Sequence, residues 1–461
     1  MSLRSTSTSV PASTMAVLML SVFTVSMAYG IVLPLLPDVI VQQLGAAGDG
    51  SQVSGTTGLL TALYTLALFL FAPSWGYLSD RYGRRIILLI GLTGFGATMV
   101  TFAFIENLTA VYAERFLSGV FAAAVTPVAL AAVGDLEATD DVRARRLTFV
   151  SLAGISGFLL GPMLGVFVSQ GGAYFFPSAG ALAFPLTMTA GLATIVALAV
   201  AVTLSGSTGD AASAKQDRSV TAVVPWLVPK LLTLAFIVSA GVGVFEVGLA
   251  LRGKQELGLT QYQIALMFTE CSLVMFAAQA IVFSTWVKPE ATRWLIAPAF
   301  AVLAAGLFLV PRASNFALML VVIGAVAASA GILSPILTYW ISSKAGKAQG
   351  AELGKQTAAS SLGVTVGSAA GGLFFNVTWF PNASFVLMTG LVVAGGLLSL
   401  GLANQLMSRK IDVGAYDDEG RTSAKPFNSS ATAGPTPELN QRSKSYAVVA
   451  GSQDHNSERN L

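Results

Sequence analysis

The sequence predicts an all-α membrane protein with twelve transmembrane helices in two pseudo-symmetric six-helix halves. Of its 461 residues, 54% are hydrophobic and only 11% are charged, whereas soluble domains carry about 25% charged residues. The 46 glycines suit helices that pack closely inside a bilayer. With one cysteine and one histidine, the chain offers neither an internal disulfide framework nor a multi-histidine metal site.

Each transmembrane helix needs roughly 20 mostly apolar residues. Such stretches are expected at residues 15–40, 54–78, 86–104, 107–134, 147–169, 179–205, 226–251, 262–286, 292–311, 315–341, 356–378 and 384–408. The first is too long for a signal-peptide core and lacks a cleavage site, so we expect it to stay in the protein.

The cations give the expected orientation, because cytoplasmic loops carry an excess of Lys and Arg. With twelve spans, both termini lie on one side, and that side holds 22 of the 26 Lys and Arg residues. The opposite loops hold only Arg252, Lys254 and Arg312, and Arg115 falls within a span. We therefore expect cytoplasmic termini and a multi-pass protein of the cytoplasmic (inner) membrane.

Three polar segments complete the expected domain organisation. Residues 1–14 form a short cytoplasmic N-terminus, and residues 206–225 link an N-terminal half (15–205) to a C-terminal half (226–408). Residues 409–461 are rich in Ser, Asn, Gly and charge, so a disordered cytoplasmic tail is expected. An inert tail and a regulatory tail both remain open.

The two halves repeat two motifs at nearly the same offset. Gly157, Gly161 and Gly165 in "GFLLGPMLG" are matched 206 residues later by Gly363, Gly367 and Gly371 in "GVTVGSAAG". "GYLSDRYGRR" is matched 208 residues later by "STWVKPEATR", which pairs Arg85 with Arg293 and replaces Asp80 with Lys288. Many transporters are built from such repeats and bind their substrate between them. A glycine row also suits helix packing alone.

These motifs resemble those of the major facilitator superfamily. "GYLSDRYGRR" at 76–85 is similar to its loop signature G-x-L-x-D-R-x-G-R-R at every specified position. Arg115 resembles the family's buried arginine, and "GFLLGPMLG" with Pro162 resembles the helix-bending motif of the twelve-helix drug–proton antiporter branch. The segment "AQGAELGKQ" is similar to that branch too. The resemblance covers residues 15–408 and implies transport by alternating access.

The hairpin is expected to act as a cytoplasmic gate formed by Gly76, Asp80, Arg81, Gly83, Arg84 and Arg85. Its glycines permit a tight turn, and the anion Asp80 suits the positive end of a helix dipole. The resemblance implies that this helix is the span at 356–378, and that the cluster parts when the protein opens inward. The arginines alone would also serve to orient the chain, but Asp80 has no part in that rule.

Charges inside the membrane are candidate functional groups, because each costs about 2.5–3.5 kcal/mol to insert at a helix centre. The substrate or coupling-ion candidates are Glu114, Arg115, Glu246 and Glu270. The resemblance implies that Arg115 faces the central cavity, where it binds an anion, tunes a carboxylate or holds a neighbouring span. Adjacent helix positions point about 100° apart, so Glu114 and Arg115 are not expected to face one neighbour together.

Glu246 and Glu270 are the leading proton or cation sites. The resemblance places the span of Glu246 beside the cavity, and the rival interpretation pairs Glu246 with Arg252 or Lys254. Glu270 lies deeper, with weaker grounds for access. The sequence departs from the antiporter pattern in the first span, which has no carboxylate before Asp38, and in the fifth, where Thr148 replaces an expected glycine.

Three functions compete. The first is proton-coupled export of a lipophilic or amphipathic small molecule by an antiporter. The second is import or symport of a polar metabolite or metal ion, and the third is a non-transporting receptor or scaffold. No phosphate loop, nucleophile constellation or metal-ligand cluster suggests an enzyme, a cofactor or a nucleic-acid partner. The expected partners are a small-molecule substrate, protons and the lipid bilayer, and no oligomer is required.

Overall fold

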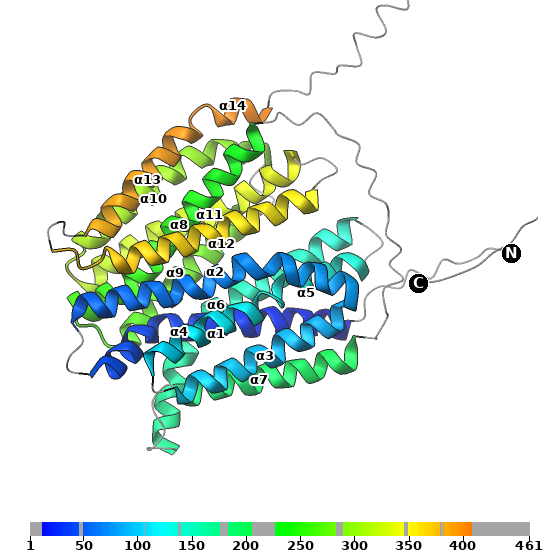
Figure 1. Ribbon diagram of the computed structural model, residues 1–461. Coiled ribbons are helices and arrows are strands. Elements are labelled where there is room, and N and C mark those ends of the chain that lie inside the picture. Colours follow the sequence, from blue (N-terminus) through cyan, green and yellow to red (C-terminus); the bar gives the residue numbers. More distant parts are fainter. Residues whose placement is uncertain are drawn as a thin grey trace, which may run out of the picture. The chain divides into compact units, whose positions relative to one another are not determined.

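The computed structural model describes residues 12–45, 49–105, 107–136, 140–175, 183–204, 226–282, 289–344, 349–378, 380 and 382–407. Within these ranges the regular structure is entirely helical, which confirms the predicted all-α class (Figure 1). The predicted linker at 206–225, the predicted tail at 409–461, residues 1–11 and Lys288 lie outside the described residues.

The N-terminal half comprises α1 (Ala12–Leu44), α2 (Gly50–Tyr82), α3 (Arg84–Phe104), α4 (Leu108–Ala122), α5 (Thr126–Leu136), α6 (Asp140–Phe175) and α7 (Ala183–Thr203). The C-terminal half comprises α8 (Leu227–Leu251), η2 (Arg252–Glu256), α9 (Gln261–Val282), η3 (Pro289–Leu295), α10 (Ile296–Leu309), η4 (Val310–Arg312), α11 (Phe316–Lys344), α12 (Gln349–Leu373), α13 (Ala383–Ser399) and α14 (Leu402–Met407). Each of the twelve predicted spans overlaps at least one of these helices.

In the described part of the chain, ten helical stretches are long and apolar enough to cross a membrane. One of them, Leu108–Val133, combines α4 and α5 across a short turn. The apolar helix α13 has 17 residues, and α12 has 25 residues but includes Glu352 and Lys355. The predicted count of twelve therefore depends on α12 and α13 crossing beside more apolar neighbours.

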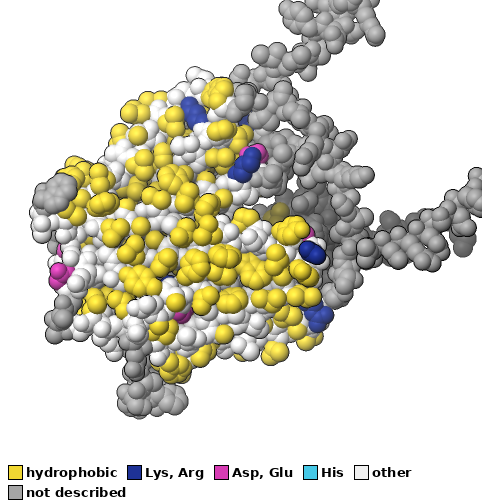
Figure 2. Space-filling model, viewed as in Figure 1, with side chains coloured by type: hydrophobic (Ala, Val, Ile, Leu, Met, Phe, Trp, Pro, Cys, Tyr) yellow, Lys and Arg dark blue, Asp and Glu magenta, His cyan; other side chains and the backbone are white. Residues whose placement is uncertain are grey.

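The buried side chains form one large hydrophobic core in each half. One core draws on residues between Met15 and Leu204, and the other draws on residues between Leu227 and Leu406 together with Leu33. The outer surface is also largely apolar, as Figure 2 shows for one face. Val202, Val321 and Phe104 are exposed. A large exposed apolar surface is what a chain surrounded by lipid requires.

The repeated glycines bring helix backbones together in the same way in both halves. Gly157 and Gly161 let α6 lie against α1, and a Cβ on Gly161 would come within 2.6 Å of the Met27 carbonyl oxygen. Gly363 and Gly367 let α12 lie against α8, where a Cβ would collide with the carbonyl oxygens of Phe236 and Ala240. The motif repeat therefore corresponds to a repeated helix-packing contact.

The two ends of the helices can be named by the residues that they carry. The Asp38 end holds the C-terminus of α1 and the N-terminus of α2, and the Asp80 end holds the turn between α2 and α3. Asp49 caps α2 at the Asp38 end by accepting a 2.8 Å hydrogen bond from the Gln52 backbone N–H. This hydrogen bond holds the pKa of Asp49 below its usual value.

The halves meet at the Asp38 end, where α12 runs along α2 (Figure 1). The backbones of α2 and α12 approach closely at Gly58 and Gly372, since a Cβ on Gly58 would lie 2.7 Å from the Gly372 Cα. Every hydrogen bond and ion pair that we observe between described residues of the two halves lies at this end or beside the central cavity.

Candidate functional site

A cavity of about 400 Å³ lies between the two halves. The N-terminal half contributes lining residues from α1, α2, α4, α5 and α6, and the C-terminal half contributes them from α8, α9 and α12. Serine and threonine hydroxyls are scattered among aromatic and aliphatic side chains. The size and the mixed lining suit a drug-sized organic molecule.

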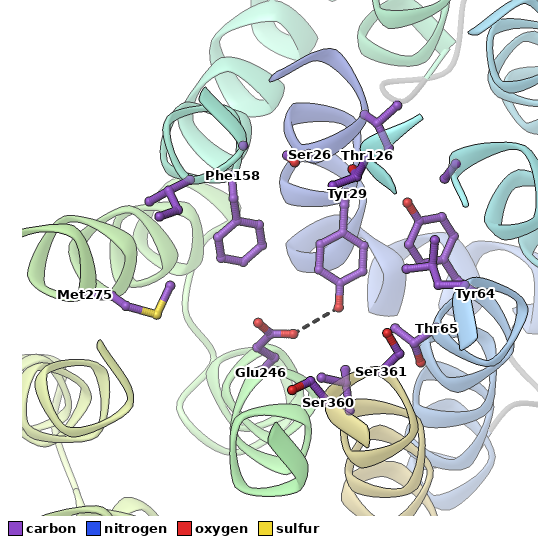
Figure 3. A pocket seen from close by; sticks show the side chains of 16 residues that line it. Ser26, Tyr29, Tyr64, Thr65, Thr126, Phe158, Glu246, Met275, Ser360 and Ser361 are labelled. Atoms are coloured by element: carbon purple, nitrogen blue, oxygen red, sulfur yellow. Dashed lines mark hydrogen bonds between the residues drawn. The ribbon is translucent and has the colours of Figure 1, made fainter. Parts of the chain in front are cut away.

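Glu246 is the one charged side chain among the described residues that line the cavity. It reaches the cavity from α8, and one of its oxygens, Oε2, accepts a 2.9 Å hydrogen bond from the Tyr29 hydroxyl on α1 (Figure 3). Ser360 and Ser361 of α12 lie near it in the same view. The site therefore places one carboxyl group at the boundary between the halves.

A row of three aromatic rings forms the opposite wall of the cavity (Figure 3). The Tyr29 ring stacks between Tyr64, with centroids 5.3 Å apart, and Phe158, with centroids 5.7 Å apart. All three belong to the N-terminal half, on α1, α2 and α6. Stacked rings present flat apolar faces on which another ring system can pack.

Glu114 and Arg115 pair with each other, and neither lines the cavity. Both are buried at 3% exposure, and the Arg115 Nε and Nη2 groups donate to the two Glu114 oxygens at 2.7 and 3.0 Å. The Arg115 guanidinium also lies 4.3 Å from the centre of the Phe102 ring. The predicted orientation of Arg115 into the cavity is not observed. The two side chains are long enough to bend toward each other from adjacent helix positions, and Arg115 therefore pairs with Glu114.

Glu270 lies on α9, away from the residues that line the cavity. Its Oε2 atom is buried without a hydrogen-bond partner among the described residues, and its Oε1 atom faces Gly324 of α11. The structure therefore does not bring Glu246, Glu270 and Glu114 together. No group of three or more His, Cys, Asp or Glu side chains in the described ranges is arranged to hold a metal ion.

The charged hairpin lies at the Asp80 end. Asp80 is 63% exposed and pairs with Arg84 at 2.6 Å, while Arg85 donates to the Ala201 carbonyl oxygen of α7. Gly83 has a φ of 93°, which a side chain would strain, and it separates α2 from α3. Gly76 and Arg81 complete the hairpin. Among the described side chains, the ion pair of Asp80 stays within the hairpin and does not reach α12.

The glycine–proline motif lies on the face of α6 that packs on α1. Pro162 is inside the helix and contacts the Gly30 position, and Gly165 lies beside Ile31. Gly157 and Gly161 make the close contacts described above. A bending role for the motif stays a prediction.

Polar side chains join the halves at the Asp38 end. Asp38 of α1 pairs with Lys254 at 2.5 Å and accepts a 3.0 Å hydrogen bond from Gln261. Arg252 is buried, pairs with Glu256 and donates to the Ala313 carbonyl oxygen. The rival interpretation, in which Arg252 or Lys254 neutralises Glu246, is therefore wrong, since both cations have other partners.

Sequence reasoning missed Tyr29, Tyr64 and Phe158. A tyrosine in the middle of an apolar span was the available signal, because a buried phenol hydroxyl usually finds a partner. The sequence did not indicate which residue the hydroxyl would bond, since Tyr29 and Glu246 are 217 positions apart in the chain.

A multi-pass helical chain with a ligand-sized cavity between two similar halves has the architecture of a membrane transport protein. The chain belongs to the Major Facilitator Superfamily, whose family model matches residues 18–354. This confirms the family predicted from the hairpin motif.

The sequence is similar to those of family members that are named for drug resistance. It is 26% identical over 381 residues to multidrug resistance protein 2 of Bacillus subtilis, covering 81% of this chain and 92% of that protein. It is 25% identical over 391 residues to the quinolone resistance protein NorA of Staphylococcus aureus, covering 83% and 95%. The fold is similar, with a TM-score of 0.66 at 14% identity, to a bacterial homologue of the human lysosomal transporter Spinster, covering 85% of this chain and 96% of that one.

Proposed function

We propose that the protein is a secondary active transporter that exports an amphipathic small molecule in exchange for protons by alternating access. The observation that carries the proposal is the cavity itself, in which a single carboxyl group from one half faces three stacked rings from the other. A carboxyl group that binds a proton and a cationic substrate in turn couples their movements. Export fits the resistance named for both bacterial relatives.

The lining also favours one substrate class. Its rings and aliphatic side chains suit a flat lipophilic body, and Glu246 suits a positively charged amine. No cluster of metal ligands in the described ranges supports the metal-ion alternative.

We further propose that the Asp80 end is cytoplasmic, on the cytoplasmic (inner) membrane, because the loops expected on that side hold most of the Lys and Arg residues of the sequence. In that orientation the halves are joined on the outer side, so the structure corresponds to an inward-facing state. The gate hypothesis then accounts for the exposed position of Asp80: its contact with α12 would form only when the Asp80 end closes.

Replacing Asp80 with asparagine is expected to lower transport roughly tenfold, because a charge-assisted contact that closes the Asp80 end is lost. Folding should be little affected, since an exposed pair such as Asp80–Arg84 stabilises a helix only weakly. Transport in vesicles and the melting temperature in detergent measure the two effects. Glu290→Gln, which removes an exposed carboxylate at the same end, is the matched control. Normal transport by Asp80→Asn would contradict the hypothesis that Asp80 helps to close the Asp80 end.

The proposed function is tested with purified protein in sealed proteoliposomes, using ethidium as a flat cationic probe, with and without a pH gradient. The wild type is expected to accumulate ethidium against its gradient when protons flow the other way. Glu246→Gln should abolish this proton-driven accumulation of ethidium, because an amide cannot take up and release the proton. Glu270→Gln, which removes a carboxyl group away from the cavity, is the matched control for the role of the cavity.

Two outcomes would contradict the proposal. Gradient-driven flux that survives in Glu246→Gln but disappears in Glu270→Gln would move the proton site out of the cavity. Folded wild-type protein that moves neither ethidium nor other organic cations or neutral amphipathic compounds would favour the receptor or scaffold alternative.

A further inference from the structure

The hydrogen bond between Tyr29 and Glu246 joins the two halves within the cavity. Tyr29 belongs to the N-terminal half and Glu246 to the C-terminal half, and both line the cavity. Thr65 and Thr365 also meet across the boundary at 2.9 Å, but Thr365 is outside the lining. Among the described residues, the Tyr29–Glu246 bond is thus the hydrogen bond that connects two lining side chains from opposite halves.

Glu246 has no cationic partner among the described residues. The nearby cations are engaged elsewhere: Arg115 with Glu114, Arg252 with Glu256 and Lys254 with Asp38. The other charged or titratable side chains around the pair are Tyr64 of α2, Arg115 of α4 and Cys271 of α9, and Glu270 lies beyond Cys271. The lining residues of α6 and α12 carry no titratable group. The Tyr29 hydroxyl is therefore the donor that balances this carboxyl group.

The Tyr29 ring is held independently of its hydroxyl. Stacking between Tyr64 and Phe158, at interplanar angles of 20° and 28°, fixes the ring whether or not the hydrogen bond is made. The hydroxyl is consequently presented to Glu246 by the N-terminal half as a whole. Because the Tyr29 ring cannot rotate freely, a change in this hydrogen bond alters the interaction between the two halves.

The strength of this bond depends on what Glu246 carries. A hydrogen bond to an ionised carboxylate is about twice as strong as one between neutral groups. A proton on the carboxyl group removes the charge, and a cationic substrate competes directly with the phenol for the same oxygens. Either event weakens the link between α1 and α8.

We propose that Tyr29 is a positioning residue through which occupancy of Glu246 controls the separation of the halves. With Glu246 ionised and unoccupied, the phenol holds the halves together in the observed arrangement. A proton on Glu246 weakens this hydrogen bond and an amine displaces the phenol, and either event frees the halves to move. This inference rests on the proposed function, because it requires Glu246 to be the coupling site.

The test compares Tyr29→Phe with Tyr64→Phe, since both variants keep a stacked ring and lose one hydroxyl, but only Tyr29 donates to Glu246. A single cysteine at Ser26, in a Cys271→Ser background, reports opening of the cavity through its labelling by a membrane-impermeant maleimide from the Asp38 side. Tyr29→Phe is expected to raise that labelling rate about three- to tenfold. It should also change the pH profile of ethidium transport, because the ionised carboxylate has lost its donor. Tyr64→Phe keeps the donor to Glu246, so its effect on both readouts should be much smaller than that of Tyr29→Phe.

Combination with Glu246→Gln distinguishes the inference from the proposed function. In that background Tyr29→Phe should add less than about half of its effect on labelling, because the charged acceptor is already absent. Equal behaviour of the two tyrosine variants, or a full additional effect in Glu246→Gln, would overturn the role of Tyr29. If Glu246→Gln alone keeps gradient-driven transport, the proposed function fails instead, whatever the tyrosine variants do.

Discussion

Gly58→Ala is expected to abolish transport by preventing closure of the Asp38 end. A Cβ at this position would lie 2.5 Å from the Ser368 carbonyl oxygen and 2.7 Å from the Gly372 Cα. These atoms belong to the backbone of α12, so no side chain can move aside to make room. The observed arrangement of α2 and α12 would become inaccessible, and the protein would remain open at the Asp38 end.

Labelling of a cysteine at Ser26 measures this effect directly. In Gly58→Ala it should react readily from the Asp38 side and slowly from the Asp80 side, whereas the wild type should alternate. Gly55→Ala is the matched control, because a Cβ there would lie 3.7 Å from the Leu373 Cδ2 atom, an ordinary contact. It should transport normally. A Gly58→Ala protein that transports at the wild-type rate would show that α2 and α12 do not need to meet this closely.

Arg115→Ala is expected to destabilise the protein by about 3–5 kcal/mol and to abolish transport. The variant leaves Glu114 as an unpaired charge at 3% exposure, and removal of one partner from a buried ion pair has a cost of that order. The contact between the guanidinium and the Phe102 ring is lost as well. The melting temperature in detergent and the yield of monodisperse protein measure the stability.

A double variant separates stability from function. Glu114→Gln with Arg115→Met removes both charges and keeps most of the volume, so folding should largely recover. If transport recovers too, the pair is structural; if the folded double variant stays inactive, Arg115 acts in the transport cycle. Arg115→Ala protein with normal stability would contradict the expected cost of the buried charge.

The fold followed from the sequence because composition and span length are strong signals in a lipid environment. The weakest element was α12, whose polar N-terminal turns contain Glu352 and Lys355 and whose glycines face α8 and α2. Its position in the molecule depends on packing rather than on hydropathy. The ends of the spans were also predicted only approximately. The first span was expected to end at residue 40, whereas α1 continues through Pro34 and Pro37 to Leu44.

The site was only partly predictable. A carboxylate within an apolar span is conspicuous, and this reasoning selected Glu246. Which carboxylate meets the cavity depends on helix rotation and on partners far away in the chain, so only the family resemblance favoured Glu246 over Glu270. The pairing of Asp38 with Lys254 and of Glu114 with Arg115 likewise depends on side-chain reach, which residue spacing does not express.

The division of the cavity walls between the halves has a consequence for affinity. The aromatic row belongs to the N-terminal half and the carboxyl group to the C-terminal half. In the proposed alternating-access cycle, each wall keeps its own geometry while the distance from the rings to the carboxyl group changes. A stiff molecule that spans this distance on one side of the membrane will fit it less well on the other. Tight capture and weak release would then arise from one set of side chains, without a second binding site.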